Sequence, residues 1–220
     1  MKILIACEES QTITKAFRKK GHEAYSCDLQ AESGGHPEWH IKGDALKEAY
    51  SGKYDLMIAH PPCTYLAVSG ARWMYNKDGS RNKERWNNQL EALEFVQKLM
   101  NAPIDKIAVE NPVSVISSQI RKPDQIIQPY HFGDEATKTT CLWLKGLPLL
   151  THTNVVGKGE RVTFKSGKSH PKWYADALSK AKTKAERQKL RSKTFTGIAN
   201  AIVDQWGSLE AHIIKVEKRS

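Results

Sequence analysis

A cysteine follows two prolines directly after an apolar run, and this arrangement suits a nucleophile. Residues 54–59 read YDLMIA and are bounded by turn formers, which predicts a short buried strand. Pro61 and Pro62 fix their own φ angles and restrict the residue that precedes each of them. Cys63 is therefore held in a defined direction, which covalent catalysis requires and which a core thiol or a disulfide does not.

The other three cysteines fit structural positions. Cys7 and Cys27 each end an apolar run, and Cys141 lies within the apolar stretch TTCLWL. Free cysteines are commonly buried and inert. Four separated cysteines without a CxxC motif indicate reduced thiols, with no disulfide framework and no structural zinc site. We expect no metal in this protein.

The positive charge is concentrated in one stretch. The chain carries a net charge of +10, and residues 156–195 hold twelve lysines and arginines against three acidic residues. A local excess of cations is typical of a surface that binds a polyanion. A solvated helix face rich in lysine is the alternative. The residues that we assign to polyanion contact in this stretch are Lys180, Lys182, Lys184 and Arg187.

Length and hydropathy limit the class of protein. A chain of 220 residues can bury one core and a small appendage. It contains no apolar stretch of about 18 residues, so we expect no membrane span. Its N-terminus lacks the apolar region of a signal peptide, which favours a cytoplasmic protein. The oligomeric state is not indicated.

Strand and helix patterns alternate along the first half of the chain. Strands are predicted at 2–7, 22–28, near 40–42, 54–59 and 105–112, and a later one within 139–150. Helices are predicted at 11–21, after Asp44, at 86–101 and at 196–206, and a turn followed by a single helix is expected over 170–193. Alternation of this kind predicts an α/β fold, with a mostly parallel sheet and helices on both faces.

Ligands of such sheets bind beyond the carboxyl ends of the strands. Six chemically capable residues lie just past a predicted strand end, and we expect them to converge on one edge of the sheet: Glu8, Glu9, Asp28, Asp44, Cys63 and Glu110.

Taken together, these residues resemble the DNA cytosine-5 methyltransferases in a compact, phage-like form. The resemblance rests on PPC at 61–63, ENP at 110–112, acidic residues at the ends of the second and third strands, and TGIANAIVDQW at 196–206. It implies a Rossmann-like methyltransferase fold with S-adenosylmethionine as the methyl donor, in a prokaryotic or phage-infected host cell. It also implies a catalytic core at 1–150, a small basic insertion at 151–195 in place of a target-recognition domain, and a C-terminal segment, 196–220, that returns to the core.

The resemblance also implies a reaction. Cys63 would add to C6 of a cytosine flipped out of DNA, and Glu110 would protonate N3, so that C5 becomes nucleophilic enough to accept a methyl group. Asn111 and Lys138 would lie on the DNA side of the site.

The methyl donor would bind along the same edge of the sheet. Asp28 would accept hydrogen bonds from the ribose hydroxyls, and Asp44 from the adenine amino group, although Asp44 also fits a helix N-cap. Glu8, Glu9 and Ser10 would contact the amino-acid end of the donor. Pro61 is assigned to the donor site as well.

The chain departs from the family in three ways, and alternatives stay open. The loop CEESQTIT contains no glycine, the family's arginine pair after the sixth strand is not evident, and no large target-recognition domain is present. The alternatives are transfer of another group, a free cytosine nucleotide as substrate, or a DNA-binding protein without catalysis. The intact Cys63 and Glu110 argue against the last, and the basic stretch argues against a free nucleotide.

Overall fold

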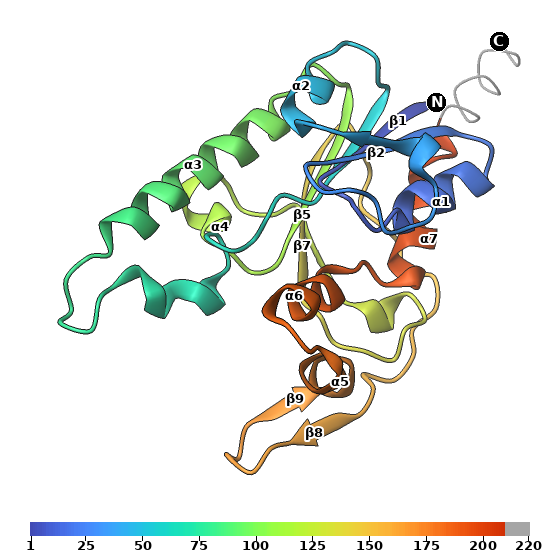
Figure 1. Cartoon of the computed structure of the whole chain (residues 1–220). Coiled ribbons are helices and arrows are strands. Elements are labelled where there is room, and N and C mark those ends of the chain that lie inside the picture. The colour runs from blue at the N-terminus through green and yellow to red at the C-terminus, as the bar shows by residue number, and fades with distance from the viewer. Residues whose placement is uncertain (210–220) are drawn as a thin grey trace, which may run out of the picture. The chain divides into compact units, whose positions relative to one another are not determined.

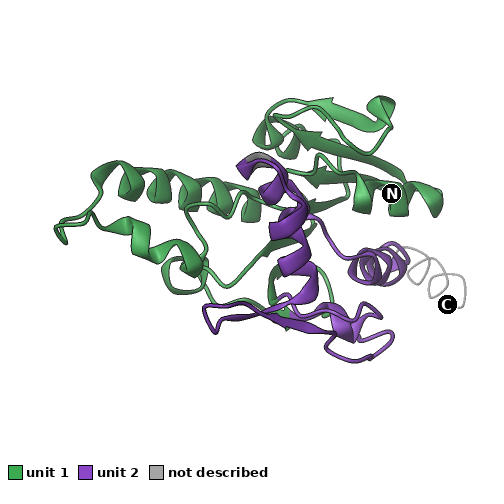
Figure 2. Cartoon of the chain, turned by 60° about the horizontal axis from the view of Figure 1, so that its bottom comes forward, with its two compact units in different colours: residues 1–126, 139–149 green, residues 127–138, 150–220 purple. Residues whose placement is uncertain are grey.

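A computed structural model of the chain describes residues 1–209 and contains two compact units (Figure 2). Unit 1 comprises residues 1–126 and 139–149, and unit 2 comprises residues 127–138 together with the chain from residue 150 onward. The domain boundaries expected from the sequence stay a prediction. Residues 210–220 of the expected C-terminal segment lie outside the described residues.

A seven-stranded sheet forms the centre of unit 1, and its strand order is β3-β2-β1-β4-β5-β7-β6 (Figure 1). The strands are β1 (Lys2–Ala6), β2 (Glu23–Asp28), β3 (His40–Lys42), β4 (Leu56–Ala59), β5 (Lys106–Asn111), β6 (Gln125–Ile127) and β7 (Thr140–Lys145). The first five strands are parallel, and β7 runs antiparallel to β5. This is a Rossmann-like α/β architecture with a mostly parallel sheet, so the predicted fold class is confirmed.

Helices cover both faces of the sheet, as predicted. On one face, α2 (Ala45–Ala49), α3 (Lys83–Met100) and α4 (Ile116–Gln119) pack against alternate strand residues such as Leu4, Met57 and Ile107. The opposite face carries α1 (Thr12–Lys19), where Arg18 Nε donates to the carbonyl oxygen of Ala24 at 2.7 Å. Because parallel strands are buried on both sides, their sequences read as nearly continuous apolar runs.

Two boundaries differ from the sequence prediction for local reasons. The first strand ends at Ala6 rather than Cys7, because Cys7 adopts a left-handed backbone with φ of 60°. The helix predicted from residue 86 begins at Lys83, because the side chain of Asn82 accepts a hydrogen bond from the backbone N–H of Arg85 at 3.1 Å.

Unit 2 contains the basic stretch. A short hairpin is formed by β8 (Arg161–Thr163) and β9 (Ser169–Pro171), and it is followed by α5 (Lys172–Lys180), α6 (Lys184–Ser192) and α7 (Thr196–Trp206). The prediction of a single lysine-rich helix is wrong. The backbone is extended at Thr183, whose side chain forms a capping box with Glu186 and starts a second helix. The helix predicted at 196–206 is confirmed.

Three short 3₁₀ helices complete the described chain. These are η1 (Pro37–Trp39) after β2, η2 (Val68–Met74) before α3, and η3 (Pro129–His131) after β6. The sequence patterns do not predict them, because such short segments show no hydrophobic period.

Glu8 fixes the start of α1. Its side chain is 5% exposed, and its carboxylate accepts hydrogen bonds from the backbone N–H of Ile13 at 2.7 Å, the N–H of Thr14 at 3.3 Å and the hydroxyl of Thr14 at 2.7 Å. The helix N-terminus leaves such N–H groups without partners, and it favours a negative charge. Glu8 therefore caps the N-terminus of α1 from a position that precedes the helix.

This arrangement predicts that Glu8→Ala destabilises the fold. Removing the carboxylate leaves buried donors of α1 without acceptors, which should lower the free energy of unfolding by about 1–3 kcal/mol. Denaturant unfolding would measure the loss, with Glu9→Ala as a control because the Glu9 carboxylate accepts from the hydroxyl of Ser33 in the 29–39 loop. Equal stability of Glu8→Ala and the parent would contradict this account of the helix start.

Candidate active site

The candidate site lies at the carboxyl ends of two neighbouring strands, β4 and β5. Their parallel register pairs Ala59 with Val109, so the next residues along each strand, His60 and Glu110, emerge side by side. His60 Nδ1 and Glu110 Oε2 are 2.9 Å apart and form a hydrogen bond. The two side chains are 15% and 20% exposed, so the pair is largely shielded from solvent.

The loop after β4 is anchored to the end of β5. Asn111 is buried, and its Nδ2 donates to the carbonyl oxygen of Pro61 at 2.8 Å. Beyond the prolines, the carbonyl oxygen of Cys63 accepts hydrogen bonds from the backbone N–H of Leu66 and of Ala67. The predicted rigid presentation of Cys63 is therefore matched by a loop held at both ends. Whether Asn111 also contacts DNA stays a prediction.

Only one thiol of the described residues is exposed, and it belongs to Cys63. Burial raises the pKa of Cys27 to about 12, with further contributions from Glu48 and Asp28. Burial also raises the pKa of Cys7 and of Cys141 above the usual range of a thiol. These three thiols are protonated at neutral pH and poorly nucleophilic, in keeping with their predicted structural positions.

His60 was not singled out by the sequence analysis. Its Nε2 is buried and has no hydrogen-bond partner among residues 1–209, although Nδ1 bonds to Glu110. A buried polar atom without a partner costs free energy, and such atoms gather at functional sites. The available signal in the sequence was a histidine between a buried strand and two prolines.

The residues assigned to the donor follow β1, β2 and β3 at the same edge of the sheet. Asp28 Oδ1 accepts from the backbone N–H of Gln30 at 2.8 Å, and Asp44 Oδ1 accepts from that of Leu46 at 2.8 Å. The N-cap role of Asp44 is thus confirmed, and its role at adenine stays a prediction.

The loop between β1 and α1 carries the other donor residues. Glu8 is engaged with α1, Glu9 accepts from the hydroxyl of Ser33, and the hydroxyls of Ser10 and Thr12 are 3.1 Å apart. At Gln11 the backbone is left-handed, with φ of 56°, as it is at Cys7. Non-glycine residues in this region are strained and occur often at ligand sites. The loop makes the tight turns of a glycine-rich loop without glycine.

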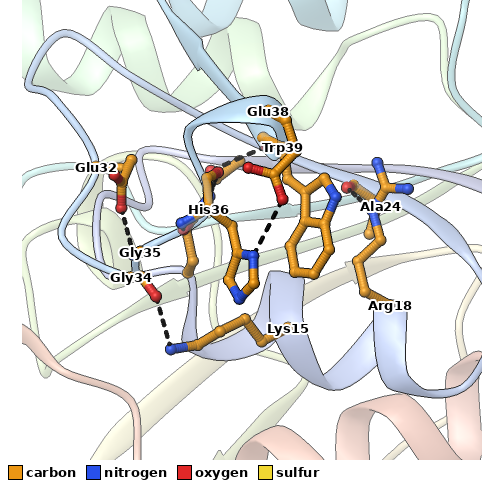
Figure 3. A network of polar contacts seen from close by, with 11 residues as sticks. Lys15, Arg18, Ala24, Glu32, Gly34, Gly35, His36, Glu38 and Trp39 are labelled. Atoms are coloured by element: carbon orange, nitrogen blue, oxygen red, sulfur yellow. Dashed lines mark hydrogen bonds and ion pairs between the residues drawn. The ribbon is translucent and has the colours of Figure 1, made fainter.

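The chain that follows Asp28 is fixed by a polar network (Figure 3). His36 stacks on Trp39 with ring centroids 3.8 Å apart, and its Nδ1 lies 3.1 Å from Glu38 Oε1. Lys15 Nζ donates to the carbonyl oxygen of Gly34 at 3.2 Å. This network holds the 29–39 loop against α1 and so restricts the surroundings of Asp28.

The residues assigned to DNA lie mostly in unit 2. Lys138 Nζ donates to the carbonyl oxygen of Lys193 at 3.1 Å and lies 5.9 Å from the centre of the Trp173 ring. The side chains on α5, the following turn and α6 are exposed: Lys180, Lys182, Lys184 and Arg187. Trp173 Nε1 donates to the carbonyl oxygen of Thr137 at 3.0 Å, so its ring packs within the unit.

Residues 1–209 contain neither a candidate membrane span nor a cluster of metal ligands. None of the helices there is both long and apolar enough to cross a membrane. Within the same part of the chain, no group of three or more His, Cys, Asp or Glu side chains is placed to hold a metal ion.

Comparisons with known proteins find similarity among solved structures and none at the level of sequence. No protein-family model matches the sequence, and no curated protein matches it. Among solved structures, the chain is similar to one described as a candidate DNA modification methyltransferase encoded within a prophage, from E. coli, with 12% identity and a TM-score of 0.44. The match covers 71% of this chain and 52% of the other, so it spans about half of that protein. At this identity, a shared activity does not follow.

Proposed function

We propose that the protein transfers a methyl group from S-adenosylmethionine to C5 of cytosine in DNA. The observation that carries this proposal is the exposed Cys63 on an anchored Pro-Pro loop that follows His60, whose side chain is hydrogen-bonded to Glu110 at the end of the neighbouring strand. A nucleophile and a carboxyl group at adjacent strand ends are the two groups that activation of cytosine C5 requires.

The chemistry assigns one step to each group. The Cys63 thiolate forms a bond to C6, and the electron pair of the C5–C6 double bond passes into the ring as Glu110 delivers a proton to N3. The resulting enamine makes C5 nucleophilic. When bound, S-adenosylmethionine supplies the methyl group that C5 takes up. The donor would be left as S-adenosylhomocysteine. The C5 proton then passes to water and N3 returns its proton to Glu110, which restores the C5–C6 double bond and expels Cys63 as a thiolate.

His60 is a positioning residue in this proposal. Its hydrogen bond to Glu110 Oε2 selects one orientation of the carboxyl group, and the surrounding burial limits exchange with water. Groups that act in proton transfer must be placed within about 3 Å of the atom they protonate. A carboxyl group left to rotate freely would spend less time in that position.

The donor-binding edge offers groups of the right chemistry. Asp28 presents its carboxylate at the end of β2 and Asp44 just past β3, and neither side chain is buried. Ribose hydroxyls and an adenine amino group are hydrogen-bond donors, so acceptors are needed there. Glu9 and Ser10 are the remaining polar side chains of the β1–α1 loop that we assign to the amino-acid end.

DNA as the partner is supported by charge. The exposed cations of α5 and α6, with the turn between them, form a basic surface in unit 2, and a single nucleotide phosphate would not require so many. Cations of this kind bind phosphates without reading the base sequence. We therefore assign Lys180, Lys182, Lys184 and Arg187 to the DNA backbone.

We expect Cys63→Ser to reduce methyl transfer to background. An alcohol at neutral pH is a far poorer nucleophile than a thiolate, so addition to C6 should fail while donor binding is unchanged. The measurement is transfer of labelled methyl groups to DNA, with mass spectrometry of the nucleosides to identify 5-methylcytosine. Cys141→Ser is the matched control, because that thiol is buried in β7. Turnover by Cys63→Ser near that of the parent would exclude covalent catalysis.

The acid and its partner should behave as a unit. Glu110→Gln keeps the shape but cannot deliver a proton, and we expect a loss of about 10²- to 10⁴-fold in the single-turnover rate. His60→Ala should show part of that loss. Because His60 acts through Glu110, the double variant should be no slower than Glu110→Gln alone. The measurement is the single-turnover rate of the two single variants and of the double variant. If the rate losses of the single variants multiply in the double variant, His60 has a role separate from that of Glu110.

A further inference from the structure

An exposed group of aromatic and basic side chains follows Cys63 within unit 1. The 68–86 segment comprises η2, a turn and the first residues of α3, and it is the teal part of the chain in Figure 1. It exposes Val68 by 50%, Trp73 by 55% and Tyr75 by 51%. Large apolar side chains at adjacent positions on a surface mark an interaction site more often than scattered ones.

Positive charge accompanies these rings. The segment contains five cations and two acidic residues, and the cations are Arg72, Lys77, Arg81, Lys83 and Arg85. Two of the guanidinium groups lie over indole rings, with Arg72 Cζ at 4.4 Å from the centre of Trp73 and Arg81 Cζ at 4.9 Å from that of Trp86. Cations interleaved with exposed aromatic rings match the phosphates and bases of an unpaired nucleic acid strand. An apolar protein partner would not call for this charge.

The segment is ordered before any ligand binds. The backbone N–H of Asn76 donates to Ser80 at 2.8 Å, and Tyr75 pairs with Arg81 in a short antiparallel bridge. Trp86 Nε1 donates to the carbonyl oxygen of Met74 at 3.1 Å. A surface already fixed in one conformation loses little entropy on binding.

The same segment is attached to the candidate active site. Arg85 donates to the carbonyl oxygen of Thr64, directly after Cys63, at 2.9 Å. The backbone N–H of Val68 donates to the carbonyl oxygen of Val113, just past β5, at 3.1 Å. A nucleotide bound on the segment would therefore lie on a surface that is hydrogen-bonded to the chain beside both the nucleophile and the acid.

We propose that the 68–86 segment binds unpaired nucleotides beside the target base, so that single-stranded DNA is the preferred substrate. This inference rests on the proposed function and specifies its substrate. Bases in a duplex are stacked on one another and cannot lie flat on Trp73 or Tyr75, whereas those of a single strand can. Arg72 and Arg81 would pair with the phosphates of the same strand.

The test is the affinity of the full chain for one labelled oligodeoxynucleotide, measured as a single strand and as a duplex. We expect the parent to prefer the single strand. Trp73→Ala with Tyr75→Ala should weaken single-strand binding by about tenfold or more, since each stacked base contributes substantially, and should change duplex binding little. Trp73→Phe should retain most of the affinity. Tyr50→Ala is the control, because Tyr50 is an aromatic residue exposed by 50% outside the segment.

Charge gives a second readout. For Arg72→Gln with Arg81→Gln, the slope of log K against log salt should fall in magnitude by about 0.7 for each lost contact to a single strand. Equal affinity of the parent for both forms of DNA, or parental single-strand affinity in the Trp73→Ala and Tyr75→Ala variant, would overturn the inference.

Methyl transfer to the same oligonucleotide separates the two proposals. If the parent methylates it but loss of the rings leaves binding unchanged, this inference fails and the proposed function stands. If binding depends on Trp73 but no methyl group is transferred, the proposed function fails.

Discussion

The candidate site depends on the register between β4 and β5. Because Ala59 lies opposite Val109 in parallel strands, His60 and Glu110 leave the sheet as neighbours, and the amide of Asn111 reaches the carbonyl oxygen of Pro61. A slip of one residue would turn these side chains to the opposite face of the sheet. The buried β7, which pairs with β5 along its length, opposes such a slip. The packing of the sheet thus determines the relative positions of His60, Glu110 and Asn111.

The loops beyond this edge are held by backbone hydrogen bonds that join the separate parts of unit 1. The turn at Cys63 is continuous with the 68–86 segment, and that segment is bonded to the chain after β5. The opposite half of the edge, past β1 to β3, is fixed through Glu8 and the His36–Trp39 stack. Nucleophile, acid, aromatic surface and donor side chains are therefore supported by one sheet, which suits a site that must bring a base and a cofactor together.

Much of this arrangement could be predicted, because buried strands and a rigid Pro-Pro-Cys turn leave strong local patterns. Cys63 and Glu110 were placed past their strands by that reasoning. His60 was missed because its partner is 50 residues away and only the register brings them together. The 68–86 segment was missed because exposed rings show no hydrophobic period. The prediction of a single basic helix was wrong because the lysine-rich composition suits a helix throughout. The break at Thr183 depends on a local capping box.

The most direct test of covalent activation by Cys63 uses DNA that contains 5-fluorocytosine. After methyl transfer the fluorine at C5 cannot leave as a proton would, so the bond between the nucleophile and C6 should persist. Mass spectrometry of peptides from the trapped complex would locate the attached nucleotide. We expect a donor-dependent adduct on Cys63. Methylated product from ordinary DNA, together with no adduct or with an adduct on another cysteine, would contradict the account.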